Sequence, residues 1–151
     1  MNLQLQKFEY FRGADILAEE YTYLSENDKE KIINIDSEAT FDFEDEHMNY
    51  TCYLLIEPIE LEKYKKVLDL NLIAYLCHDI SQSVIKNQLN LEKILTKYIT
   101  PDNERDYYTF IKTVDDWVTS KLDLDMVLDM INDKGIKSLR EIDLQFLNKY
   151  K

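Results

Sequence analysis

The sequence predicts an α+β fold, with a small, mostly antiparallel sheet near residues 40–77, flanking helices and an all-helical C-terminal half. Two periodicities support this prediction. Apolar residues alternate with polar ones from residue 40, and after residue 81 they recur every three to four positions. Composition supplies a third observation, because two Gly and two Pro among 151 residues are too few for the many turns of an all-β fold.

Two short helices are expected before the sheet. Residues 14–24 place Leu17, Tyr21 and Leu24 at helical spacing, which indicates an amphipathic helix. Ser25 and Asp28 then form a capping pair, and we expect further helical turns over residues 29–35.

A β-hairpin is predicted over residues 40–57. Phe41 and Phe43 alternate with Asp42 and Glu44, which is typical of a strand with one apolar and one solvated face. Residues 50–57 are aromatic and aliphatic and predict a second strand. The four residues 46–49 between them have the length of a hairpin loop.

Pro58 is well suited to the first position of the next helix, whose buried stripe is Leu61, Tyr64 and Leu68. The apolar run 72–77 has two interpretations. It either continues the helical stripe or forms a buried third strand of the sheet, after Asn71 ends the helix in the left-handed conformation. The strand is favoured, because a third strand would make the two-stranded hairpin a more stable sheet.

In the C-terminal half, the helical spacing of apolar residues predicts four helices, over residues 82–99, 102–121, 125–134 and from Ser138 onward. Thr100 is the expected N-cap of the second helix, and Pro101 lies in its first turn. Gly135 suits the left-handed end of the third, and Ser138 with Glu141 predicts a capping box. No Gly-, Ser- or Pro-rich linker divides residues 1–151, so a single domain is expected, with residues 125–151 as a helical hairpin appended to it.

The sequence LDMINDKGIKSLREIDLQFLNKY at residues 128–150 resembles a small helical hairpin that ends many uncharacterised bacterial proteins and some rhomboid-type membrane proteins. Those endings carry a run of acidic residues after Ser-Leu, where this chain has Arg140, Glu141 and Ile142. The resemblance implies a packing or docking hairpin without a catalytic residue.

Negative charge is concentrated near the N-terminus. The chain has 30 acidic and 18 basic side chains and a net charge of −12, of which residues 1–60 carry −11, with 15 acids and four Lys or Arg. Such a surface repels phosphate, which disfavours DNA, RNA and anionic lipid as direct partners. It favours a basic protein partner or a divalent cation; the alternative is that the charge only keeps copies of the protein apart.

Catalytic and metal-binding patterns are weak in this sequence. Cys52, Cys77, His47 and His78 lack the spacing of a zinc site, and Gly13 and Gly135 are too far apart for a phosphate-binding loop. We therefore expect neither metal nor cofactor. Residues 1–12 have no apolar stretch typical of a signal peptide, and the longest apolar run is too short to span a membrane, so a cytoplasmic location is expected.

These observations favour a non-catalytic cytoplasmic protein-binding module with an acidic N-terminal face, such as an inhibitor, an immunity-type protein or a nucleic-acid mimic that binds a basic partner. One alternative is a small enzyme or ligand-binding domain that uses Cys52 and His78; another is a homo-oligomeric structural protein. Aromatic side chains are enriched at interfaces, and only one of the adjacent Tyr107 and Tyr108 can face the core of its helix. The candidate binding residues are Tyr21, Tyr23, Asp42, Glu44, Asp45, Glu46 and Tyr108.

Overall fold

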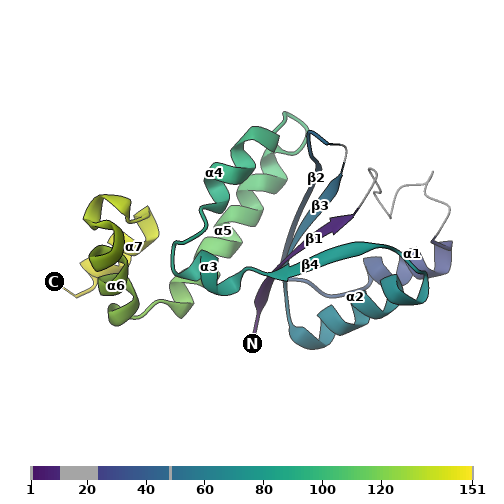
Figure 1. Cartoon of the computed structure of the whole chain (residues 1–151), viewed down its shortest axis with the longest axis horizontal. Helices are drawn as coiled ribbons and strands as arrows, with labels where there is room; N and C mark the ends of the chain where they lie inside the picture. Colours follow the sequence, from purple (N-terminus) through teal and green to yellow (C-terminus); the bar gives the residue numbers. More distant parts are fainter. Residues whose placement is uncertain (1, 11–23, 48, 151) are drawn as a thin grey trace. The chain divides into compact units, whose positions relative to one another are not determined.

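The computed structural model describes residues 2–10, 24–47 and 49–150. The chain forms two compact units, Met1–Ile80 and Ser81–Lys151. The first contains a four-stranded antiparallel sheet and two described helices, and the second is helical (Figure 1). The predicted α+β class is therefore confirmed.

The sheet consists of β1 (Gln4–Tyr10), β2 (Ala39–Glu44), β3 (Tyr50–Ile56) and β4 (Tyr75–Asp79), in the spatial order β2-β3-β1-β4 (Figure 1). All three neighbouring pairs are antiparallel. With the helices α1 (Glu26–Ile33) and α2 (Pro58–Leu70), the described elements follow the order βαββαβ, which is the split βαβ or ferredoxin-like topology.

Both helices pack on the same face of this sheet. The alternation of side chains along a strand puts Phe8, Cys52 and Leu54 on that face, where they form one core cluster with Ile32 of α1 and Leu68 of α2. The predicted starts of both helices are confirmed. Ser25 caps α1 by accepting a 3.1 Å hydrogen bond from the amide of Asp28, and Pro58 is the first residue of α2.

The predicted hairpin is confirmed, but β1 is not anticipated by the sequence patterns. It is an inner strand that separates β3 from β4. The run 72–77 is partly a strand, as favoured, but β4 begins only at Tyr75 and lies at the edge of the sheet. The left-handed residue after α2 is Leu72, with φ 56°, and not Asn71, whose φ is −98°. The predicted helix over residues 14–24 falls almost entirely outside the described residues.

The second unit begins with α3 (Ser81–Ile85), α4 (Leu91–Leu95) and a 3₁₀ turn, η1 (Thr96–Tyr98). The single helix predicted over residues 82–99 is therefore wrong, because Asn87 adopts a left-handed φ of 58° and interrupts it. The long helix α5 (Glu104–Lys121) follows. Its N-cap residue is Asn103 and not Thr100, whose amide instead donates a 2.7 Å hydrogen bond to the Asn103 side chain.

The C-terminal hairpin consists of α6 (Leu124–Lys134), the 3₁₀ turn η2 (Ile136–Ser138) and α7 (Glu141–Asn148). Gly135 adopts the predicted positive φ, 84°. The predicted cap at Ser138 is wrong, because its hydroxyl donates to the carbonyl of Gly135 and α7 begins three residues later. Instead, the fully buried Asp143 accepts the amide of Arg140 at 3.0 Å.

Candidate functional site

Four of the predicted binding residues lie at the β2–β3 hairpin. Asp42 and Glu44 are exposed and project from the same face of the edge strand β2. Asp45 has a structural role, since its Oδ1 accepts the amides of His47 at 2.8 Å and Asn49 at 2.9 Å. Glu46 is exposed in the loop. The hairpin therefore presents Asp42, Glu44 and Glu46 to solvent and uses Asp45 to close its turn.

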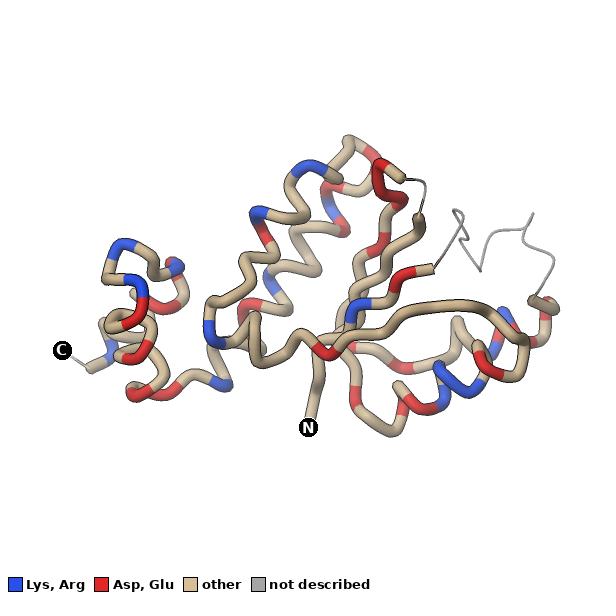
Figure 2. Tube along the Cα trace, viewed as in Figure 1, with Lys and Arg blue, Asp and Glu red and all other residues tan. Residues whose placement is uncertain are grey.

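The acidic charge of the first 60 residues is not one uniform surface. On α1, Lys29 and Lys31 form ion pairs with Glu26 and Asp28, at 3.6 and 3.4 Å. By contrast, residues 32–62 contain nine Asp or Glu and no Lys or Arg. Figure 2 shows this difference as alternating charges along α1 and red without blue along the hairpin. The stretch of the sequence without Lys or Arg therefore covers β2, its loops, β3 and the start of α2.

Some of these carboxylates have interactions within the first unit. Glu60 accepts a 2.8 Å hydrogen bond from Lys63 and a 3.2 Å hydrogen bond from the amide of Asp36. These two donors, Lys63 first, lower the pKa of Glu60. Asp42 accepts a hydrogen bond from the hydroxyl of Tyr50. Because the register pairs Asp42 with Cys52 and Glu44 with Tyr50, the Tyr50 ring lies diagonal to Asp42 and reaches its carboxylate.

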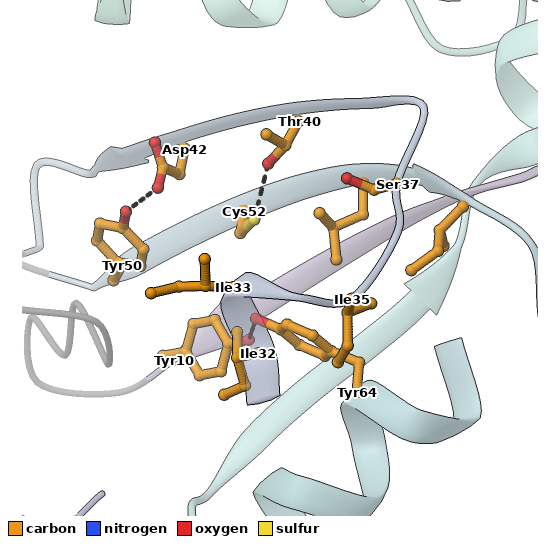
Figure 3. Close-up of a pocket in the computed structure, with 12 residues that line it drawn as sticks. Tyr10, Ile32, Ile33, Ile35, Ser37, Thr40, Asp42, Tyr50, Cys52 and Tyr64 are labelled. Carbon is orange, nitrogen blue, oxygen red and sulfur yellow. Dashed lines mark hydrogen bonds between the residues drawn. The ribbon is translucent and has the colours of Figure 1, made fainter. Parts of the chain in front are cut away.

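A cavity of about 210 Å³ lies beside Asp42, between α1, the segment that follows it and the helix-covered face of the sheet (Figure 3). Its walls are mostly isoleucines and tyrosines. The hydroxyls of Tyr10 and Tyr64 are hydrogen-bonded to each other in its wall. Burial, followed by the neighbouring Tyr64, raises the pKa of Tyr10, so this hydroxyl stays protonated at neutral pH. The lining residues are Tyr10, Ile32, Ile33, Ile35, Ser37, Thr40, Asp42, Tyr50, Cys52, Leu54, Ile56 and Tyr64.

The register separates Cys52 from His78, the pair on which the enzyme alternative was based. Phe8 of β1 pairs with Cys52 on one side and with Cys77 on the other. Cys52 and Cys77 thus share a face but lie two strands apart, about 9.6 Å at the usual strand spacing. His78 follows Cys77 directly and projects from the opposite face. Cys52 therefore cannot use His78 as a base.

The described surroundings of the two cysteines are those of structural thiols. Cys52 is buried, and its sulfur lies 3.6 Å from the hydroxyl of Thr40. Cys77 is partly buried and donates to Gln6 at 3.3 Å. Burial is the main cause that raises the pKa of Cys77, which lowers its thiolate fraction at neutral pH.

The second unit contains Tyr108 and a groove of about 570 Å³ beside it. As expected, one tyrosine of the adjacent pair is buried and the other is not: Tyr107 is 2% exposed and Tyr108 is 58% exposed. In the groove, burial and the nearby Glu92 raise the pKa of Asp115 to about 6, while Arg140 opposes the shift. Tyr108 belongs to a different unit from the hairpin, and Tyr21 and Tyr23 lie outside the described residues.

Comparisons with protein-family models, curated proteins and solved structures yield no significant match. Within residues 2–10, 24–47 and 49–150, no group of three His, Cys, Asp or Glu side chains is placed to hold a metal ion. In the same ranges, every helix is too short or too polar to cross a membrane.

The sequence patterns identified the charged residues of the hairpin but not the cavity beside them. The cavity depends on Tyr10, Tyr50 and Tyr64, which come from three different elements. Tyr50 and Tyr64 were predicted at apolar positions of a strand and a helix, but no local pattern indicates that their hydroxyls turn toward a shared cavity.

Proposed function

We propose that this protein is a non-catalytic protein-binding module, and that the β2 side of its sheet docks a basic partner protein. One observation carries the proposal: the 31 residues from Ile32 to Glu62 contain nine carboxylates and no Lys or Arg. These residues form the end of α1, both strands of the hairpin and the first turns of α2. Glu60 is paired with Lys63, just beyond this range, and a basic partner would meet a net negative charge on the range as a whole.

The position of β2 supports the same proposal. It is an edge strand, so its outer side is accessible to a partner in a way that the inner strands are not. Asp42 and Glu44 project from one face of this strand, and both are exposed. An inhibitor or immunity-type protein that covers a basic enzyme surface would use such an edge, as would a mimic of nucleic acid, whose phosphates these carboxylates would imitate. Either form would act in the cytoplasm.

The proposal is tested by capture from a native lysate with the full chain as bait. The test variant is Asp42→Asn/Glu44→Gln, and the matched control is Asp129→Asn/Asp133→Asn, which removes two exposed charges from α6 in the other unit. A partner retained by the wild type and the control at low salt, but lost by the test variant and at high salt, would support the proposal. Capture that is absent, or equal for both variants, would contradict it.

A further inference from the structure

The cavity beside Asp42 is small. Its volume of about 210 Å³ is below the roughly 300–1,000 Å³ of pockets that hold drug-sized ligands or cofactors. It is also open to solvent at the side of the edge strand, where Asp42 and Thr40 are exposed. The space therefore suits a single long side chain better than a nucleotide or a whole cofactor.

The cavity walls suit an aliphatic chain. Ile32 of α1 and Ile35 of the following segment line it (Figure 3). Leu54 and Ile56 line it from β3. Lys and Arg side chains bury their methylene stems against such surfaces while the charged group stays near water.

The polar part of the cavity suits a cation. Among the described residues that line it, Asp42 is the one carboxylate, and none is Lys, Arg or His. The rings of Tyr10 and Tyr50 lie with their centroids 6.3 Å apart at an interplanar angle of 39°, and tyrosine rings attract ammonium and guanidinium groups. The hydrogen bond from Tyr50 holds the Asp42 carboxylate next to these rings. The negative charge of Asp42 would repel an anion at this position.

We propose that this cavity receives one Lys or Arg side chain of the basic partner, with its stem against the isoleucines and its cationic group between Asp42 and the tyrosines. This inference rests on the proposed function and gives it a specific anchor. Aromatic and charged residues that fill a pocket commonly dominate the binding energy of an interface, so a single inserted side chain would fix the partner's position on the acidic hairpin.

The test uses ¹⁵N-labelled full-length protein and three blocked amino acids: N-acetyl-arginine amide, N-acetyl-lysine amide and N-acetyl-norleucine amide. Norleucine has an aliphatic stem like that of lysine but no charge. We expect one or both cationic compounds to shift the amide resonances of cavity residues at millimolar concentration, and norleucine to bind about fivefold more weakly or worse. Equal binding of all three compounds would assign the cavity to apolar ligands and overturn the proposal, as would an absence of shifts.

Two variants separate the cavity from general electrostatics. Asp42→Asn and Glu44→Gln each remove one charge from the same face of β2, but only Asp42 lines the cavity. We expect Asp42→Asn to weaken binding of the cationic compounds about fivefold, and Glu44→Gln to change it less than twofold. If a captured partner binds with the expected salt dependence but is equally sensitive to both variants, the acidic docking surface stands and the cavity proposal fails.

Discussion

Replacing Arg140 with alanine provides a stringent test of how the second unit is held together. Its guanidinium donates to both carboxylate oxygens of Asp143 at 3.0 Å, and to the carbonyls of Val84 and Ile85 at 2.5 and 2.8 Å. Arg140 thus joins the start of α7 to the end of α3, more than 50 residues away in the chain.

The magnitude follows from the burial of this pair. The Asp143 side chain is 0% exposed, and the Arg140 side chain is 19% exposed. Removing one partner of a buried ion pair costs about 3–5 kcal/mol, because the other charge remains buried without compensation. The partial exposure of Arg140 places the expected loss at the lower end, about 3 kcal/mol. With an m-value of about 1.5 kcal/mol per molar urea, the unfolding midpoint falls by about 2 M.

Urea unfolding followed by tryptophan fluorescence measures this loss, because the single Trp117 lies in α5 of the same unit and is 7% exposed. Lys112→Ala is the matched control. It breaks the exposed 3.2 Å pair with Asp116 on α5, which is worth about 0.5 kcal/mol at most. The double variant Arg140→Met/Asp143→Leu should recover part of the loss, because no buried charge remains, although the carbonyls of Val84 and Ile85 still lack their donor. A loss below about 1 kcal/mol for Arg140→Ala would refute this explanation.

Three further predictions concern single residues. The pKa of Asp115 is raised from 3.8 to about 6 in the folded protein. Between these pH values the Asp115 carboxyl keeps its proton in the folded state and releases it in the unfolded state. This group therefore makes the stability of the protein fall as pH rises from about 4 to 6. We therefore expect the free energy of unfolding of Asp115→Asn, relative to that of the wild type, to be higher at pH 8 than at pH 4, measured by urea unfolding. The same difference at both pH values would contradict this. Leu72 has a left-handed φ of 56°, which is unfavourable for a side chain with Cβ, and it is 91% exposed, so it loses little packing on replacement. Leu72→Gly should therefore raise the free energy of unfolding by about 1 kcal/mol, measured by hydrogen exchange of β1 amides. A loss of stability would contradict this. Iodoacetamide at pH 7.5 should modify native Cys77 slowly and Cys52 more slowly still, and both rapidly in urea; fast native labelling of Cys52 would show an activated thiol.

Local patterns predicted the elements whose determinants are local. The alternation of Phe41 and Phe43 with acidic residues identified β2, and Pro58 and Ser25 marked the starts of two helices. These signals work because side-chain alternation and capping depend on neighbouring residues alone.

The errors arose where distant contacts decide the conformation. β1 is an inner strand because β3 and β4 pair with it from both sides. Its own pattern is weaker, because the alternation of apolar and polar residues changes phase at Lys7, between Leu5 and Phe8. Asn87 interrupts the predicted helix and donates a 2.9 Å hydrogen bond to the carbonyl of Ser138, 51 residues away. The candidate site follows the same division: composition indicated the acidic hairpin, whereas the cavity depends on the packing of α1 and α2 against the sheet.

The most direct test of the central claim is a map of where a basic peptide binds. ¹⁵N-labelled full-length protein is titrated with a 12-residue peptide of alternating Arg and Ser, at 50 and 300 mM NaCl. Docking at the β2 side predicts amide shifts concentrated on Ala39–Glu44 and the residues lining the cavity, with affinity that falls steeply between the two salt concentrations. Shifts spread over acidic residues of both units, or concentrated on the second unit, would contradict it.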